Sequence, residues 1–110
     1  MGIRDIDDFE AEIIERHNIK HYTVQQAIDW VRANNNTPVH ISFDVDALDP
    51  SFVDSTGTRV ANGLTPLEVR SIIEESMIQD NLVSLDVVEF NPLLGDPEHS
   101  LKAVKEVFQF

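Results

Sequence analysis

The residues best suited to chemistry in this sequence are two aspartates separated by a single residue. Asp44 and Asp46 end an alternating apolar run, and Asp49 follows shortly after. On a regular strand, residues i and i+2 lie on the same face, so the two carboxylates are expected to converge. Converging carboxylates repel each other unless a proton or a cation lies between them. Oxygen ligands of this kind suit hard divalent ions such as magnesium, calcium or manganese.

Two other interpretations of this segment must be weighed. An EF-hand calcium loop opens with the same aspartate pattern, but it needs glycine at its sixth position and glutamate at its twelfth. Counted from Asp44, these positions hold Asp49 and Ser55, which excludes an EF-hand. A structural alternative stays open at this point, in which Asp44 and Asp46 cap the turn that follows and Asp49 caps the next one.

The elements that position these residues alternate between helix and strand. Apolar residues at helical spacing, together with helix-capping residues, predict helices over 7–17, 24–33, 65–79 and from Pro97 onward, the last with Leu101, Val104 and Phe108 on its apolar face. Alternating apolar residues predict strands over 39–45 and 82–90, and residues 18–22 are interpreted as a turn into a short strand.

This order predicts an α/β fold with parallel strands joined by a right-handed crossover helix. The carboxyl edge of such a sheet, where Asp44 lies, is the usual ligand-binding edge. Parallel sheets need both faces covered, and two or three strands with few helices cannot cover them. We therefore expect these residues to be part of a larger protein or to need a partner, and to be marginally stable or molten alone.

Composition narrows the function further. Hydrophobic residues make up 42% of the 110 residues, which excludes an intrinsically disordered chain. A net charge of −12 disfavours binding to nucleic acid or to an anionic membrane surface. The sequence contains no cysteine, so disulfides and thiolate chemistry are excluded. No signal pattern or membrane-spanning stretch is evident, and the cytoplasm is the expected location.

Three motifs resemble one enzyme family. Residues 42–50, SFDVDALDP, followed by TGT at 56–58 and NGLT at 62–65, resemble the metal loop of the ureohydrolases, SFDxDxxDP…GTGTP…GGLT. Residues 89–95, EFNPLLG, are similar to the run EVNPxLG of the arginase branch, and residues 2–10, GIRDIDDFE, are similar to its run GLRDVDPGE. The resemblance extends over nearly the whole chain.

The resemblance implies a fold and a reaction. The fold is a three-layer αβα arrangement with a parallel sheet, as in arginases and deacetylases, and residues 1–110 form a single partial domain from its C-terminal portion. The reaction is the hydrolysis of L-arginine to L-ornithine and urea by a hydroxide that bridges two manganese ions. Asp44 and Asp46 match metal ligands. The family's proton-transferring histidine has no match, so no catalytic residue is assigned.

The resemblance also implies substrate-binding roles. Glu89 matches a glutamate that binds the guanidinium group, and Thr58 matches a hydroxyl in the same pocket. Asp7 matches a carboxylate that recognises the α-amino group, and Glu10 assists through water. Structural alternatives remain for each: Glu89 pairs with a neighbouring cation, Thr58 belongs to a turn, and Asp7 and Glu10 favour the positive end of a helix.

The sequence also departs from the family pattern. The two upstream motifs that carry the other metal ligands, GGDHS and DAHxD, do not occur in it. Asp54 and Arg59 stand where the family mostly has proline, Asn62 replaces a glycine, and Leu67 replaces an arginine near the family's subunit contact. Two alternatives to an arginase therefore stay open: an inactive paralogue that acts as a regulatory or assembly subunit, and another ureohydrolase such as an agmatinase. The expected partners are a guanidino substrate and either further copies of the chain or a complete arginase.

Overall fold

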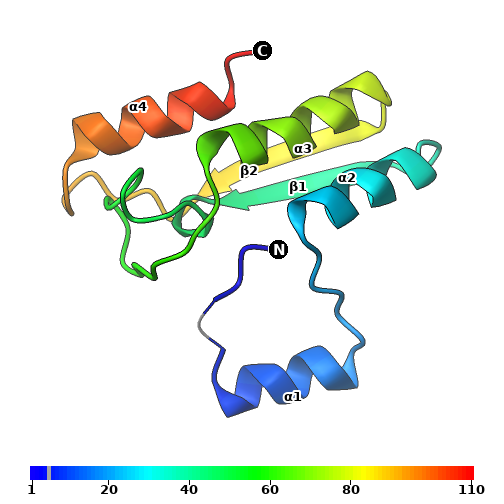
Figure 1. Ribbon diagram of the computed structural model, residues 1–110, viewed down its shortest axis with the longest axis horizontal. Coiled ribbons are helices and arrows are strands. Elements are labelled where there is room, and N and C mark those ends of the chain that lie inside the picture. The colour runs from blue at the N-terminus through cyan, green and yellow to red at the C-terminus, as the bar shows by residue number, and fades with distance from the viewer. Residues whose placement is uncertain (5) are drawn as a thin grey trace.

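A small parallel sheet and the helices around it make up the fold (Figure 1). The computed structural model describes residues 1–4 and 6–110. In chain order its elements are α1 (Asp8–Arg16), α2 (Val24–Ala33), β1 (Val39–Asp44), a 3-10 turn η1 (Val45–Ala47), α3 (Pro66–Ile78), β2 (Leu82–Val88) and α4 (Pro97–Val107). The α/β order predicted from the sequence is confirmed.

The two strands are parallel neighbours, and α3 lies between them in the chain. Ile41 pairs with Leu85 and Asp44 pairs with Val88, so both strands end at the same edge of the sheet. This is the arrangement that the strand–helix–strand pattern predicts. The register slips by one residue between Val39 and His40.

The core lies between β1, the loop after it, and helices α3 and α4. Helix α3 packs against α2 on one side and α4 on the other, and the three helices lie over the sheet (Figure 1). The most buried apolar side chains of this core are Phe43, Val45, Leu48, Val53, Ile73 and Val107. Apolar residues alternate along β1 because one face of the strand is buried, as predicted, and Val39 and Phe43 lie on that face.

The opposite face of the sheet is polar and open. His40 and Ser42 of β1 are exposed, and so are Ser84 and Asp86 of β2. His40 contacts two polar side chains of β2 on this face. Its Nδ1 lies 2.6 Å from the Ser84 hydroxyl and its Nε2 lies 3.6 Å from the Asp86 carboxylate. The described residues thus supply a sheet and one helical layer of the three layers expected.

Helix caps explain where the helices begin. Thr23 and Thr65 each form a capping box, in which the threonine hydroxyl accepts from the third helical amide and the side chain there accepts in return. Asp7 and Asp96 cap α1 and α4 through their carboxylates. All four are residue types that the sequence pattern uses to place helix starts.

Two local expectations were wrong. Residues 18–22 contain no strand, because a strand needs a neighbour for its backbone groups and β1 and β2 pair with each other. Helix α4 buries Ser100, Ala103 and Val107, while Leu101 is 43% exposed. The predicted Val104 and Phe108 do pack against the core, so only Leu101 departs from the expected face. On the buried side, Ser100 accepts hydrogen bonds from the loop after β1.

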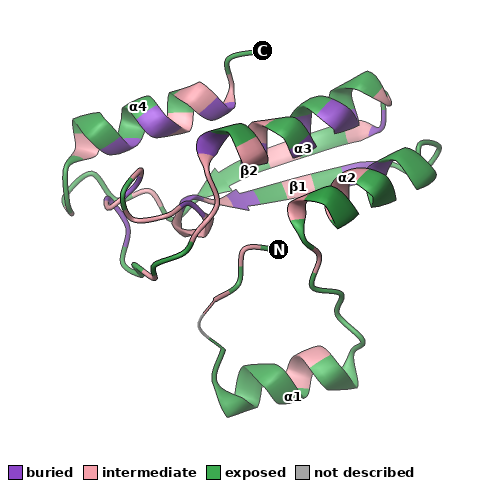
Figure 2. Ribbon diagram, in the orientation of Figure 1, coloured by how far each residue is buried: buried purple, intermediate pink, exposed green. Residues whose placement is uncertain are grey.

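Helix α1 lies apart from the rest of the molecule. It contains no buried residue, and Figure 2 shows it as almost entirely exposed. Phe9, one of its apolar residues, is 71% exposed. No helix among the described residues is long and apolar enough to cross a membrane.

Candidate metal and substrate site

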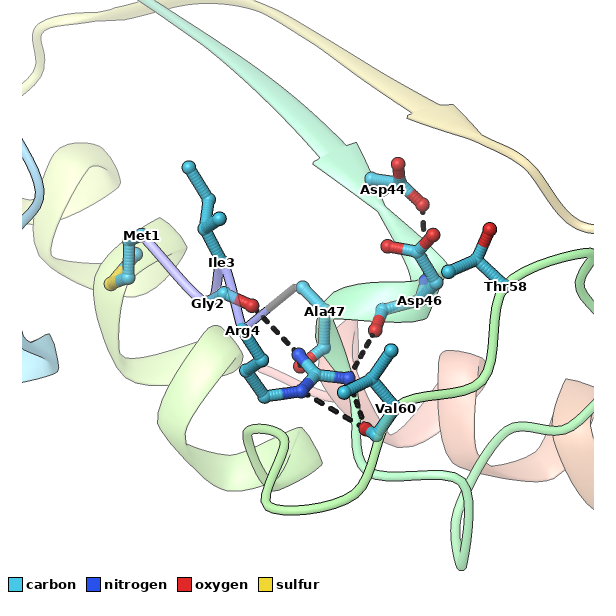
Figure 3. A pocket seen from close by; sticks show the side chains of 9 residues that line it. All are labelled: Met1, Gly2, Ile3, Arg4, Asp44, Asp46, Ala47, Thr58 and Val60. Atoms are coloured by element: carbon cyan, nitrogen blue, oxygen red, sulfur yellow. Dashed lines mark hydrogen bonds between the residues drawn. The ribbon is translucent and has the colours of Figure 1, made fainter. Parts of the chain in front are cut away.

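Asp44 and Asp46 converge, but through a turn rather than through strand geometry. β1 ends at Asp44, and η1 begins at the next residue. The Asp44 Oδ1 accepts a hydrogen bond of 3.0 Å from the Asp46 amide, so Asp44 caps this turn. Figure 3 shows the two side chains together at one side of a cavity. The structural alternative is therefore true of Asp44, and it is also what brings Asp46 beside it.

The pKa of Asp46 shows how strongly the two carboxyl groups interact. Burial, a hydrogen bond with Asp44 and the Asp44 charge raise the pKa of Asp46 to about 6, and Glu89 adds to the rise. Arg4 opposes it. The pair therefore retains a proton at a pH where an isolated aspartate has lost it. A hard divalent cation fits between the Asp44 and Asp46 carboxylates, because it can bind an oxygen of each at once.

These two carboxylates are only part of a metal site. Within residues 1–4 and 6–110, no group of three or more histidine, aspartate or glutamate side chains is arranged to hold a metal ion. A catalytic site needs further protein ligands. Asp44 and Asp46 fit a divalent metal ion as part of its donor set, and a complete site would need ligands from outside the described residues.

A cavity of about 210 Å³ opens beside the aspartate pair. The N-terminal segment, residues 1–4, forms one wall, and Thr58 and Val60 form another (Figure 3). Thr58 thus lines the same cavity as Asp44 and Asp46, and its role in binding the guanidinium group stays a prediction. The three residues come from the end of β1 and from the long loop that follows it.

Asp49 fixes the start of that loop to its end. Its carboxylate accepts from the amide and hydroxyl of Ser51 at 3.0 and 2.6 Å, and from the Gly63 amide at 3.1 Å. The Ser51 hydroxyl, followed by the amides of Ser51 and Gly63, lowers the pKa of Asp49 to about 2. Asp49 therefore acts as a turn cap, which was the structural alternative for this residue.

A second set of contacts fastens the loop to α4. The Asp54 Oδ1 accepts from the Asp96 amide at 2.9 Å and from the Ser100 hydroxyl at 3.1 Å. The Asp96 amide is the main reason that the pKa of Asp54 is lowered. Asp54, which replaces a common proline of the family, thus supplies a connection that proline lacks.

Glu89 lies at the same sheet edge as the aspartates. It follows β2 directly, and the residue before it, Val88, pairs with Asp44 across the sheet. Its backbone is left-handed, with φ of +69°, which is uncommon for a residue other than glycine. Glu89 is exposed and its charge reaches Asp46, although its side chain does not line the cavity.

Asp7 and Glu10 are not brought to the cavity. Asp7 caps α1, its Oδ1 accepting from the Glu10 amide at 2.7 Å, and both residues are exposed. Neither residue lines the cavity beside Asp46. Their substrate-binding roles stay predictions, and the capping alternative describes what Asp7 does in this structure.

Arg4 is a site residue that sequence reasoning missed. It lines the cavity and donates to main-chain carbonyl oxygens around it. The available signal was the position of a cation within the otherwise acidic run 2–10, next to residues already considered for the site.

Comparisons with known proteins agree with this geometry. The chain matches the arginase family model over residues 1–109. The arginase of Glaciozyma antarctica is 44% identical over 107 residues, which cover 86% of this chain and 31% of that protein. The native arginase from Bacillus caldovelox superposes with a TM-score of 0.80 at 27% identity, covering 97% of this chain and 40% of the other.

The Entamoeba histolytica arginase, solved in complex with L-ornithine, gives a TM-score of 0.76 at 30% identity, and the match covers 99% of this chain and 42% of the other. The chain spans about a third of the length of the curated relatives that it matches. The family model covers all but the last of the 110 residues, and the fold is that of the solved arginases. The chain belongs to the arginase family.

Proposed function

We propose that this chain provides the metal loop and the guanidinium-binding edge of an arginase-type hydrolase that converts L-arginine to L-ornithine and urea. The observation that carries the proposal is the convergence of Asp44 and Asp46 at the carboxyl edge of the sheet, with Thr58 beside them. The family match and the arginase solved with L-ornithine support the same reaction.

The residues of this chain have distinct tasks in that reaction. Asp44 and Asp46 would hold two manganese ions jointly with ligands from outside the described residues. Manganese, when bound, supplies a nucleophile from water at neutral pH. Glu89 would accept paired hydrogen bonds from the planar guanidinium group and orient its carbon toward the metal loop. Thr58 would donate or accept a hydrogen bond where it lines the cavity beside Asp44 and Asp46.

The test is urea release from L-arginine with manganese supplied, by the chain alone and by a chimera. The chimera places this chain in the matching segment of the Glaciozyma antarctica arginase, whose remainder supplies what the chain lacks. We expect the chimera to release urea and Asp46→Asn to abolish the release. Asp29→Asn, an exposed aspartate of α2, is the matched control and should retain full activity. A folded but inactive chimera would contradict the proposal.

A second substrate arm separates arginase from agmatinase. Agmatine lacks the α-amino acid group that Asp7 is predicted to recognise. In the chimera, Asp7→Ala should reduce turnover of L-arginine and leave any turnover of agmatine unchanged. Turnover of agmatine but not of L-arginine by the unaltered chimera would favour the other ureohydrolase.

One observation favours a second candidate function. Because the described residues hold only two converging carboxylates, the chain alone can serve as an inactive assembly or regulatory subunit of a complete arginase. Co-purification with a complete arginase, and a change in its activity without urea release by the chain itself, would support this function.

A further inference from the structure

The side chain of Arg4 joins three separate segments around the aspartate pair. Its guanidinium donates to the carbonyl oxygens of Gly2 at 2.7 Å, Asp46 at 2.8 Å and Ala47 at 3.1 Å. Two further bonds, of 3.0 and 2.6 Å, go to the carbonyl oxygen of Val60. Within the described part of the chain, all of its hydrogen-bond partners are main-chain oxygens.

The location of these oxygens explains what the contacts achieve. Asp46 and Ala47 belong to η1, and the last carbonyl groups of a helical turn lack partners within it and attract a cation. Val60 lies two residues after Thr58, on the opposite wall of the cavity. One planar group with five N–H donors in a fixed arrangement can satisfy all these oxygens at once.

Close packing at Gly2 supports the same arrangement. Gly2 has a left-handed backbone, with φ of +75°, and a Cβ there would lie 3.1 Å from the Ala47 Cβ. The N-terminal segment therefore rests directly on the turn that carries Asp46. Figure 3 shows the Arg4 side chain passing beneath this contact, between Asp46 and Val60.

We propose that Arg4 is a positioning residue for the metal loop, which fixes the main chain of Asp46 relative to Thr58 by bridging Gly2, η1 and Val60. The claim that this positioning serves metal binding rests on the proposed function. The existence of the Arg4 bridge does not, and the bridge can be tested without metal.

The first test is amide hydrogen exchange of this chain, free of metal, within the chimera with the remainder of the Glaciozyma antarctica arginase, because the isolated chain is expected to be molten. The Leu48 amide bonds to the Val45 carbonyl and the Leu64 amide to the Ala47 carbonyl, so both report on η1. In Arg4→Gln, exchange at both amides should accelerate at least tenfold, with no change in the β1–β2 ladder. Unchanged exchange at Leu48 and Leu64, or no protection there in the unaltered chain, would overturn the proposal.

Two further variants separate geometry from charge. Arg4→Lys retains the charge, but a single ammonium group cannot reach carbonyl oxygens on three segments, so it should behave like Arg4→Gln. Arg59→Gln removes an exposed cation of the same loop and should exchange like the unaltered chain. Full protection in Arg4→Lys would show that charge alone suffices and would overturn the bridge.

The second test is line broadening of amide signals by added Mn²⁺. The signals of residues 44–47 should broaden, and Arg4→Gln should raise the Mn²⁺ concentration required by roughly 10- to 100-fold, the range for groups that orient metal ligands. If Mn²⁺ broadens nothing in the unaltered chain, the proposed metal function fails, while the exchange result still decides the role of Arg4. If broadening occurs and Arg4→Gln leaves its concentration dependence unchanged, the positioning role is contradicted.

Discussion

Asp46 and Asp49 are three residues apart in one loop, yet their pKa values move in opposite directions. Burial and the neighbouring Asp44 raise the pKa of Asp46 to about 6. Hydrogen bonds from Ser51 and Gly63 lower that of Asp49 to about 2. The first residue is poised to exchange a proton for a cation, and the second holds the loop together in its charged form. Identical residue types thus take different roles through their immediate surroundings.

This difference predicts a pH dependence for stability. The folded state binds the Asp46 proton more tightly than the unfolded state, so that stabilisation is present at low pH and is lost as the pH rises from about 4 to 6. This and the other unfolding measurements use the chain within the chimera, because the isolated chain is expected to be molten. With metal removed by EDTA, the free energy of unfolding of the chimera should therefore fall across this range relative to that of its Asp46→Asn variant. Urea unfolding at several pH values measures it, and parallel curves for the two proteins would contradict the assignment.

Asp49→Asn is the control for that experiment. The Asp49 contribution is present above its unfolded pKa near 4 and is lost as the pH falls toward 2, so its removal affects the opposite end of the range. This variant should be less stable than the unaltered chain at neutral pH.

Position 63 requires glycine because there is no room for a Cβ, and not because of its backbone conformation. A Cβ on Gly63 would overlap the main chain of Leu48 and Asp49, whereas a Cβ on Gly57 would meet nothing within 4 Å. Gly63→Ala should therefore destabilise the chain by about 2 kcal/mol, as overpacking does, and Gly57→Ala should change stability by less than about 0.5 kcal/mol. Urea denaturation of both variants checks this, and equal midpoints would show that the loop ends are not in contact.

The replacement of a family glycine by Asn62 also has a residue-level explanation. Asn62 is left-handed, with φ of +66°, and asparagine is among the few side chains that accept this conformation readily. The backbone that glycine allows is therefore retained.

At the scale of elements, one buried carboxylate connects α2 to α3. Glu75 of α3 is only 9% exposed and accepts from Arg32 Nε at 3.0 Å and from Gln79 at 2.8 Å. The hydrogen bonds from Arg32 are the main reason that the pKa of Glu75 is lowered. The Arg32–Glu75 pair therefore contributes more to stability than a fully exposed ion pair of the same type.

Arg32→Leu should lower the free energy of unfolding, because it removes the cation that faces the Glu75 carboxylate, and the partial exposure of the arginine limits the loss. Arg16 pairs with Glu12 on α1, where both side chains are more than 60% exposed. Arg16→Leu is the matched control and should change stability by less than about 0.5 kcal/mol. Equal losses in the two variants, measured by chemical denaturation, would contradict this reasoning.

Local patterns predicted most elements because their signals are local. The capping boxes at Thr23 and Thr65 and the alternation along β1 placed those elements within one or two residues. β2 ends at Val88, two residues earlier than predicted, because Glu89 adopts a left-handed backbone. The bridge from Arg4 to Val60 joins residues 56 apart, and no local pattern encodes such a contact.

For the candidate site too, the sequence could place together only residues that are close to one another in the chain. Asp44, Asp46 and Thr58 lie within one loop, and their shared cavity follows from the turn after β1. Asp7 and Glu10 depend on where α1 lies, and α1 has little to pack against in this chain. Motif spacing alone could not place a helix that buries none of its residues against the rest of the described chain.

The molecule as a whole is open for its size. Its accessible surface of 7051 Å² exceeds the roughly 6,100 Å² expected for a folded chain of this mass. Its radius of gyration of 14.4 Å exceeds the roughly 13 Å expected for 110 residues. Val83 and Val87 of β2 contribute to this surface with 67% and 43% exposure. An exposed apolar strand of this kind favours loose packing or association.

We therefore predict that the 110-residue chain alone unfolds over a broad temperature range and binds the dye ANS, as molten states do. In the chimera with the remainder of the Glaciozyma antarctica arginase, the sheet should be covered, the transition should sharpen and ANS fluorescence should fall. Scanning calorimetry and ANS titration measure both. A sharp, cooperative transition of the isolated chain, with well-dispersed amide signals, would contradict the prediction.

The contact between the first residues and the metal loop has a practical consequence for protein production. Met1 lines the cavity beside Asp46, whereas Phe110 lies at the far end of the molecule and is 58% exposed (Figure 1). An affinity tag fused to Met1 would emerge at the mouth of that cavity, and a polyhistidine tag there would bring foreign imidazoles to a place suited to divalent ions. Purification handles belong at the carboxyl terminus, where neither metal titrations nor exchange measurements would report on the tag.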